Sequence, residues 1–311
     1  MILCLGTTPV YQRTMVFERV TPDAVNRARE VCDYASGKAV NAARVVHTLG
    51  KEVLVTGFVG GARGKALVED LDRAGVAHDF VWTPAETRQC ITMIDRSKGT
   101  ATELVEESTA AGVLAWRDLD TKLRDLLPRA NVWVFSGTLA PDGNKDFYAR
   151  WLPVAAGSGA RAIVDVVGEP LRLAMGYPNA ILKMNRDELA RTLGEDLSSD
   201  EALFGAMRRR VPKLGALVVT LGAGGAIGCD VKSCWRVSSP KVDAVSAVGS
   251  GDAFAAGLAV GLSEGQPLAE AMKLATACGA ANAMTAKAGF LEKGVVEGLV
   301  GQASFESVQM V

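Results

Sequence analysis

Short apolar segments alternate along this chain with amphipathic stretches of helical length, and this alternation constrains the fold more than any other feature. The apolar segments are rich in β-branched residues, as buried strands are, and lie at residues 53–56, 132–135, 162–165, 181–183 and 217–220. The helical stretches include residues 64–74, 145–156 and 199–211. This order predicts an α/β fold of three layers, with a mainly parallel central sheet and helices on both faces. In such sheets the active site lies beyond the carboxyl ends of the strands.

A second kind of segment has strand-forming residues with one polar face, and it occurs at residues 14–20, 27–34 and 88–106. The sequence Arg-Ser-Lys-Gly at residues 96–99 is typical of a hairpin turn. Because these segments come from two separated parts of the chain, we predict a small sheet that stands off the main body as a lid. We place the lid at roughly residues 10–35 and 86–107, inserted into a single domain of residues 1–311.

The balance of charge and apolar residues excludes several classes of partner. Apolar residues make up 49% of the chain and charged residues 22%, and the formal net charge is −1. We therefore expect neither a nucleic-acid partner nor a membrane-binding basic patch. The apolar run at residues 253–262 is far shorter than the ~20 residues of a membrane span. Residues 2–5 resemble a first strand and not a signal peptide, so we expect a cytoplasmic protein.

The cysteine and histidine residues predict no metal centre. Six cysteines are scattered without a C-x-x-C pair, and the chain has only two histidines, His47 and His78. We expect neither a zinc nor a redox site, and we interpret the cysteines as reduced, buried thiols. His47 is interpreted as a half-buried helix residue.

The turn Gly249-Ser250-Gly251-Asp252 leads into a helix of small residues. Such a turn directs free backbone N–H groups and a helix N-terminus at one point, which makes a site for an anion. Asp252 in the first turn of that helix has two interpretations. It is either a simple helix cap or the base that removes a proton from a hydroxyl during phosphoryl transfer.

Two common nucleotide-binding motifs are absent from the sequence. Residues 61–66 have neither the spacing nor the hydroxyl of a Walker A loop, and the glycines of residues 222–228 come too late and at the wrong spacing for a Rossmann fingerprint. A nucleotide would therefore be bound by another scheme.

Three further motifs have both a structural and a functional interpretation. Gly37 begins a helix that presents Lys38 and Asn41 on one side, which an ordinary surface helix also explains. Asn185 and Glu188 have the spacing of a capping box, which needs no function. The strand ending at Thr220 runs into Gly222 and Gly225, which permit close approach by a flat ligand, and a predicted helix at residues 275–288 carries Asn282.

Taken in order, these motifs resemble the PfkB-type, ribokinase-like family of carbohydrate kinases. The resemblance extends from Leu3 to Gly289, and its signatures are residues 37–50, 183–188, 220–225 and 248–257. Within the family, residues 25–27, 59–61, 136–141 and 279–283 are similar to the branch of 1-phosphofructokinase and tagatose-6-phosphate kinase. Residues 87–91 are closer to the tagatose-6-phosphate kinase form.

The resemblance implies a ribokinase-like fold, ATP and Mg²⁺ as cofactors, and a homodimer joined through the lid. Asp252 would be the general base, and the anion hole would comprise Gly249, Ser250 and Gly251. The sugar phosphate would contact Gln12, Gly37, Lys38, Asn41, Arg88, Ser136 and Gly137. The nucleotide would contact Lys183, Thr220, Gly222, Gly225 and Asn282. Asn185 and Glu188 would hold Mg²⁺ through water. The implied reaction converts a ketohexose phosphate (tagatose 6-phosphate, or fructose 1- or 6-phosphate) to a hexose bisphosphate.

The sequence departs from the family pattern at three places, two in the expected sugar site and one in the expected site of a monovalent cation. Gln12 stands where this branch has an aspartate, Ser36 stands in place of the first glycine of a Gly-Gly pair, and residues 246–247 are Ser-Ala where the family has Asp-Thr or Asn-Pro. The last change weakens the case for a bound monovalent cation. The first two leave open a kinase for an unphosphorylated sugar or a nucleoside. A catalytically retired sensor of nucleotide or sugar phosphate is a further alternative.

Overall fold

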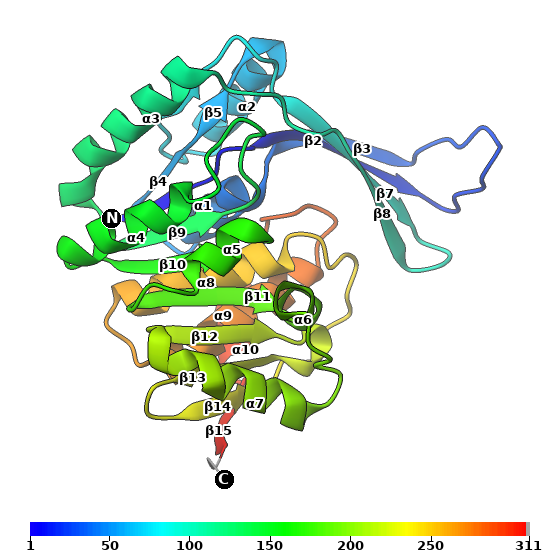
Figure 1. Cartoon of the computed structure of the whole chain (residues 1–311). Helices are drawn as coiled ribbons and strands as arrows, with labels where there is room; N and C mark the ends of the chain where they lie inside the picture. Colours follow the sequence, from blue (N-terminus) through cyan, green and yellow to red (C-terminus); the bar gives the residue numbers. More distant parts are fainter. Residues whose placement is uncertain (309–311) are drawn as a thin grey trace.

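A long central sheet runs through the molecule with helices on both faces (Figure 1). The computed structural model describes residues 1–308, and nine strands of that part form the central sheet. In spatial order they are β15 (Phe305–Val308), β14 (Cys234–Val237), β13 (Ala226–Asp230), β12 (Ala216–Thr220), β11 (Ala180–Asn185), β10 (Arg161–Asp165), β9 (Val132–Ser136), β1 (Ile2–Leu5) and β4 (Val53–Thr56). The strands from β4 to β12 pair in parallel, and β13, β14 and β15 pair antiparallel. The prediction of a mainly parallel sheet is confirmed.

Alternate residues of the central strands β1, β4 and β9 to β13 enter two separate cores, which gives the molecule its three layers. In β9, Val132 and Val134 join one core while Trp133 and Phe135 join the other. The first core is covered by α1 (Lys38–Thr48), α2 (Gly61–Arg73), α8 (Ser250–Ser263), α9 (Leu268–Ala283) and α10 (Lys293–Val300). The second is covered by α3 (Val113–Leu126), α4 (Phe147–Gly157), α5 (Glu169–Ala174), α6 (Arg186–Leu193) and α7 (Asp200–Arg210). Short 3₁₀ turns occur at Leu127–Arg129, Val211–Lys213 and Gly222–Gly224.

Helices α8 and α9 pack closely against each other. A Cβ atom on Gly257 would lie 2.7 Å from the Cα of Ala275, and one on Gly261 would lie 2.7 Å from the Cα of Ala271. The glycines of α8 therefore allow the two backbones to approach closely. The predicted helix at residues 275–288 is wrong at its end, because α9 stops at Ala283. The following residues form a loop in which the Thr285 hydroxyl donates to the backbone carbonyl of Asn282, and this side-chain bond competes with helix.

A second sheet in the described part of the chain has four strands in the order β3, β2, β7, β8 and projects from the main body (Figure 1). Its strands are β2 (Val10–Phe17), β3 (Glu30–Ser36), β7 (Arg88–Asp95) and β8 (Thr100–Val105). The predicted small sheet is confirmed, and β7 and β8 form an antiparallel hairpin that turns at residues 96–99, as expected. A parallel pair, β5 (Phe58–Val59) and β6 (Val81–Trp82), lies beside the main sheet.

The interpretation of all cysteines as reduced thiols is wrong for one pair. Cys229 of β13 and Cys234 of β14 lie directly opposite each other on antiparallel strands and form a disulfide. Their sequence separation of 5 is the length of a hairpin, and register then places the two side chains together. Cys4, Cys90 and Cys278 are free and buried.

No helix within residues 1–308 is both long and apolar enough to cross a membrane.

Candidate active site

The carboxyl ends of the parallel strands and the beginnings of α1 and α8 supply the predicted site residues. Ser136 and Asp165 are paired residues at the ends of β9 and β10, and Asn185 and Thr220 are paired at the ends of β11 and β12. Lys38 is the first residue of α1. Because the strands are parallel, their ends meet at one edge of the sheet, where a ligand can touch several of them.

The turn before α8 requires glycine at its first position. Gly249 has φ +82°, and a Cβ there would lie 2.7 Å from the Cα of Ala288. Gly249 is the N-cap of α8 and has no side chain, so no side chain caps this helix. The N–H of Ser250 donates to the Ala247 carbonyl at 3.1 Å, and the N–H groups of Gly251 and Asp252 stay available for an anion. A Cβ on Gly251 would lie 3.0 Å from the Nζ of Lys183. The ammonium group of Lys183 is therefore beside the turn, where it adds positive charge to the helix N-terminus.

Asp252 lies one residue further along α8, and its side chain is 8% exposed. Its Oδ2 accepts a hydrogen bond of 2.7 Å from the Nδ2 of Asn41 in α1, and α8 has no side-chain cap bond at its N-cap Gly249. Desolvation is the main cause that raises the pKa of Asp252 to about 6, while Lys38 opposes the rise and Asp165 adds to it. At neutral pH the group is mostly ionised yet close to its pKa, which suits a general base.

Asp165 is a central residue of the site that was not singled out from the sequence. It is 1% exposed, and its two carboxylate oxygens accept from Lys38 at 2.9 Å and from Lys183 at 2.8 Å. Desolvation raises the pKa of Asp165, but the two lysines outweigh it and the net pKa is lowered. Desolvation likewise lowers the pKa of Lys38, but Asp165 and Asp252 outweigh it and raise the net value. The only sequence signal was a carboxylate at the end of an apolar strand.

A cavity of about 230 Å³ lies between the main sheet and the small sheet. Its lining includes five of the predicted substrate residues, namely Gly37, Lys38, Arg88, Ser136 and Gly137. Thr8, Thr138 and Glu107 also line it and were not predicted. Two cations, one carboxylate, hydroxyl groups and backbone groups thus line one cavity, and the cations and hydroxyls are groups that can bind a phosphorylated polyol.

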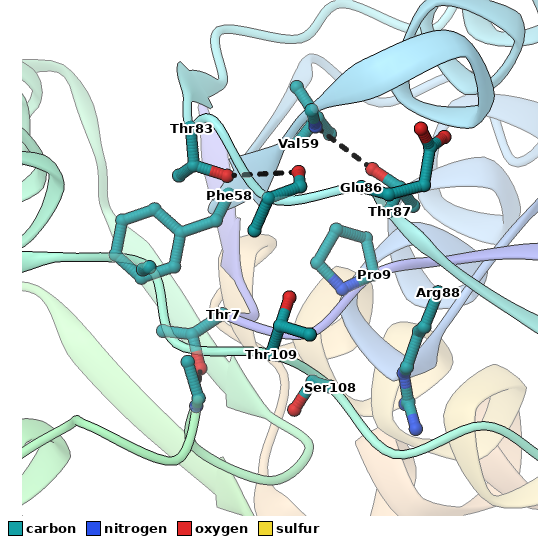
Figure 2. A pocket seen from close by; sticks show the side chains of 14 residues that line it. Thr7, Pro9, Phe58, Val59, Thr83, Glu86, Thr87, Arg88, Ser108 and Thr109 are labelled. Carbon is teal, nitrogen blue, oxygen red and sulfur yellow. Dashed lines mark hydrogen bonds between the residues drawn. The ribbon is translucent and has the colours of Figure 1, made fainter.

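Arg88 also borders a second cavity of about 30 Å³, where Figure 2 shows it with Pro9, Thr87, Ser108 and Thr109. That volume admits about one water molecule. Arg88 donates through both terminal nitrogens to backbone carbonyls, at 3.2 Å to Thr8 and 3.2 Å to Glu106. Its buried Nε has no hydrogen-bond partner within residues 1–308. These two bonds hold the guanidinium in place and use two of its five N–H donors.

Two predicted substrate residues lie outside the set that lines the larger cavity. Asn41 is buried and bonds to Asp252 and Ser36. Gln12, in the small sheet, is 4% exposed and donates from Nε2 to the hydroxyl of Thr92 at 2.9 Å. The structure therefore gives both amides protein partners.

The residues predicted to contact the nucleotide have three different local environments. Gly225 has φ +86°, and a Cβ there would meet the carbonyl oxygen of Val237 at 2.0 Å, so this turn also requires glycine. Gly222 has φ +57° with open space around its Cα, and the Thr220 hydroxyl reaches the Met184 carbonyl at 3.5 Å. Asn282 is fully buried and donates to the carbonyl of Val248 at 2.8 Å, which holds the turn before α8 from behind.

Asn185 and Glu188 form the predicted capping box at the start of α6. The Asn185 side chain accepts from the Glu188 N–H at 2.8 Å, and the Glu188 side chain accepts from the Asn185 N–H at 2.9 Å. Residues 1–308 contain no group of three or more His, Cys, Asp or Glu placed to bind a metal directly. Glu188 is near enough to Lys38 to raise its pKa, so its charge reaches the site.

This chain is similar to known carbohydrate kinases along nearly its whole length. The model of the pfkB family of carbohydrate kinases matches residues 1–292. A tagatose-6-phosphate kinase of Staphylococcus epidermidis is 30% identical over 295 residues, 94% of each chain. The structure of phosphofructokinase-2 from Escherichia coli, solved with substrates and products, has a TM-score of 0.91 at 25% identity and covers 97% of this chain and 98% of that one. A possible 1-phosphofructokinase from Thermotoga maritima shares the fold, with a TM-score of 0.91 at 22% identity and 99% of each chain covered. The chain belongs to the pfkB family of carbohydrate kinases.

Proposed function

We propose that this enzyme transfers the γ-phosphoryl group of ATP to a hydroxyl of a ketohexose phosphate and forms a hexose bisphosphate. The observation that carries the proposal is the convergence of Asp252, Lys38 and Lys183 at the start of α8, next to a cavity that Lys38 shares with Arg88. The tagatose-6-phosphate kinase and phosphofructokinase-2 similarities support a phosphorylated sugar as acceptor.

In this proposal each group of residues has a separate role in the reaction. Asp252 takes the proton of the acceptor hydroxyl, and burial has already brought its pKa near the working range. The N–H groups of Gly249 and Gly251 and the ammonium of Lys183 stabilise charge on the transferred group, whereas the N–H of Ser250 is bonded to the Ala247 carbonyl. Bound Mg²⁺ would screen the phosphates of ATP, and Asn185 and Glu188 would hold its water shell.

Asp165 holds both site lysines in place before any phosphate arrives, and its charge raises the pKa of Lys38. A phosphate dianion competes with Asp165 for the same ammonium groups, so ligand binding needs no new cation to enter the site. We infer that Lys38 and Arg88 hold the phosphate already on the sugar, and that Ser136 and Gly137 contact its hydroxyls. Thr220, Gly222, Gly225 and Asn282 would form or support the nucleotide site.

The acceptor is tested by an ADP-release assay with tagatose 6-phosphate, fructose 6-phosphate, fructose 1-phosphate and their unphosphorylated parents. We expect a higher kcat/KM for phosphorylated acceptors. Preference for unphosphorylated sugars or nucleosides would favour the alternative raised by Gln12, and ATP binding without any ADP release would favour a retired sensor.

Arg88→Gln should raise the KM only for phosphorylated acceptors. Arg96→Gln is the matched control, because Arg96 is paired with Glu30 at the tip of the small sheet.

We also propose that the small sheet is a lid on a single kinase domain and joins two subunits. Val31 and Leu104 lie on its same face by strand register and are 52% and 51% exposed. Exposed apolar side chains on a projecting sheet are typical of an interface. Light scattering of the Leu104→Glu variant tests this, and an unchanged mass would refute it. ATP as the donor is consistent with a cytoplasmic enzyme, which we also propose.

A further inference from the structure

Ser36 occupies the junction between the small sheet and the site, and its hydroxyl lies in a chain of hydrogen bonds that ends on the proposed base. It is the last residue of β3 and is 2% exposed. Its Oγ donates to the Oδ1 of Asn41 at 2.9 Å, and the Nδ2 of Asn41 donates to the Oδ2 of Asp252 at 2.7 Å. The serine at this position is a departure from the Gly-Gly pair of the family, and a glycine has no hydroxyl to make the first bond.

The side-chain amide of Asn41 bonds to two partners, a carboxylate that accepts and a hydroxyl that donates. The carboxylate of Asp252 only accepts hydrogen bonds, so it requires the NH₂ end of the amide. The carbonyl end then needs a donor inside the protein, because Asn41 is 3% exposed and is out of reach of bulk water. Ser36 is that donor.

The backbone of Asn41 is fixed independently of Ser36. A Cβ on Gly289 would lie 2.7 Å from the Cα of Asn41, so the loop after α9 is already in contact with this residue. Removal of the Ser36 hydroxyl therefore frees the rotation of the Asn41 amide but leaves its position unchanged.

We propose that Ser36 is a positioning residue of the phosphoryl-transfer reaction, and that its hydroxyl holds the Asn41 amide with its nitrogen on Asp252. Donation to the carbonyl end also polarises the amide and strengthens the N–H that Asp252 accepts. The inference rests on the proposed role of Asp252 as base. It assigns a function to the serine at the point where the sequence departs from the family.

The test is the pH dependence of kcat/KM, whose acid limb reports the base of the free enzyme. Asp252 is also faced by Lys38 from α1, Asp165 from β10 and Lys183 from β11, and Ser36→Ala leaves these groups in place. Loss of a hydrogen bond of about 1 kcal/mol to the ionised form should move the acid limb upward by roughly 0.7 pH unit. Activity should be lost mainly at low pH and return as the pH rises. Ser36→Thr, which keeps the hydroxyl, should restore the original limb.

The matched control is Ser263→Ala, which removes a partly buried hydroxyl bonded to Val260 at the far end of α8. Its profile should equal that of the unaltered enzyme. In an Asn41→Ala background, Ser36→Ala should produce no further shift, because Ser36 acts only through that amide. If Ser36→Ala fails to fold, Ser36→Cys keeps the size with a weaker donor and carries the same expectation.

Three outcomes overturn the proposal: an unmoved acid limb in Ser36→Ala, an equal loss of activity at every pH, or an additive shift in the Asn41→Ala background. A failure of the underlying function looks different. In that case Asp252→Asn would itself retain near-full turnover, whatever the behaviour of Ser36.

Discussion

Replacing Asp252 by asparagine should slow catalysis strongly and stabilise the fold in the same variant. Asp252 is buried on α8, and desolvation raises its pKa from 3.8 to about 6. A carboxyl whose pKa is raised by folding stabilises the native state fully below its unfolded value, and this stabilisation is lost as the pH rises through the folded value. Above pH 6 the native enzyme therefore bears the cost of an ionised, desolvated carboxylate. An asparagine keeps an oxygen for the Asn41 amide and carries no charge.

The magnitude follows from the shift of the pKa. A rise of about 2 units corresponds to about 3 kcal/mol, so Asp252→Asn should raise the free energy of unfolding by about 3 kcal/mol at pH 7 to 8. For a chain of this length the same change raises Tm by about 4 °C. The gain should shrink as the pH falls through 6 and fall below about 1 kcal/mol near pH 4, where the carboxyl of the unaltered enzyme is protonated in the native state.

The assay is urea unfolding followed by circular dichroism at several pH values between 4 and 8, with turnover measured in parallel. Turnover should fall by about 10²–10⁴-fold, the usual effect of losing a general base. Asp118→Asn, an exposed aspartate on α3, is the control and should change neither quantity. A variant that is less stable at pH 7, or a difference in stability that does not vary with pH, would refute the reasoning about burial. Retained turnover would refute the assignment of the base.

Two further predictions test the packing and the charges around the site. Gly257→Ala should destabilise the protein by about 2 kcal/mol in urea unfolding, because the new Cβ meets the backbone of Ala275. The same change at Gly294 of α10, which has open space, should stabilise by about 0.5 kcal/mol, and a loss there would contradict the argument. Lys183→Met removes one of the two cations on Asp165 and should cost about 3 kcal/mol in the same assay. It should also raise the KM for ATP, and an unchanged KM would argue against a phosphate contact.

Local motifs of the site were predictable because their geometry depends on neighbours in the chain. The turn at Gly249 needs only a glycine and a following helix, and the capping box of Asn185 and Glu188 needs only a spacing of three residues. The strands and helices followed from periodicity for the same reason. The end of α9 could not be predicted in this way. There the Thr285 hydroxyl bonds to the Asn282 carbonyl and the Gly289 N–H bonds to the Asn282 side chain, and these bonds replace the helix that the small residues favour.

Contacts between distant residues required the tertiary structure. Asp165 lies between Lys38 and Lys183 because β10 ends beside β11 and close to the start of α1, and no local pattern reports that sheet order. Cys229 and Cys234 are close in sequence, yet their pairing depends on the register of β13 and β14.

The sequence by itself determined the α/β architecture, the family and the glycine turn before α8, since periodicity, ordered motifs and glycine conformations are properties of short segments. Only the tertiary structure decided which charges share a buried environment. It enclosed Asp252 with two lysines and a second carboxylate, and it connected Ser36 through Asn41 to that carboxyl group. The physical reason is that a pKa and a hydrogen-bond chain depend on desolvation and on distances of a few ångströms, which packing sets after the segments have formed.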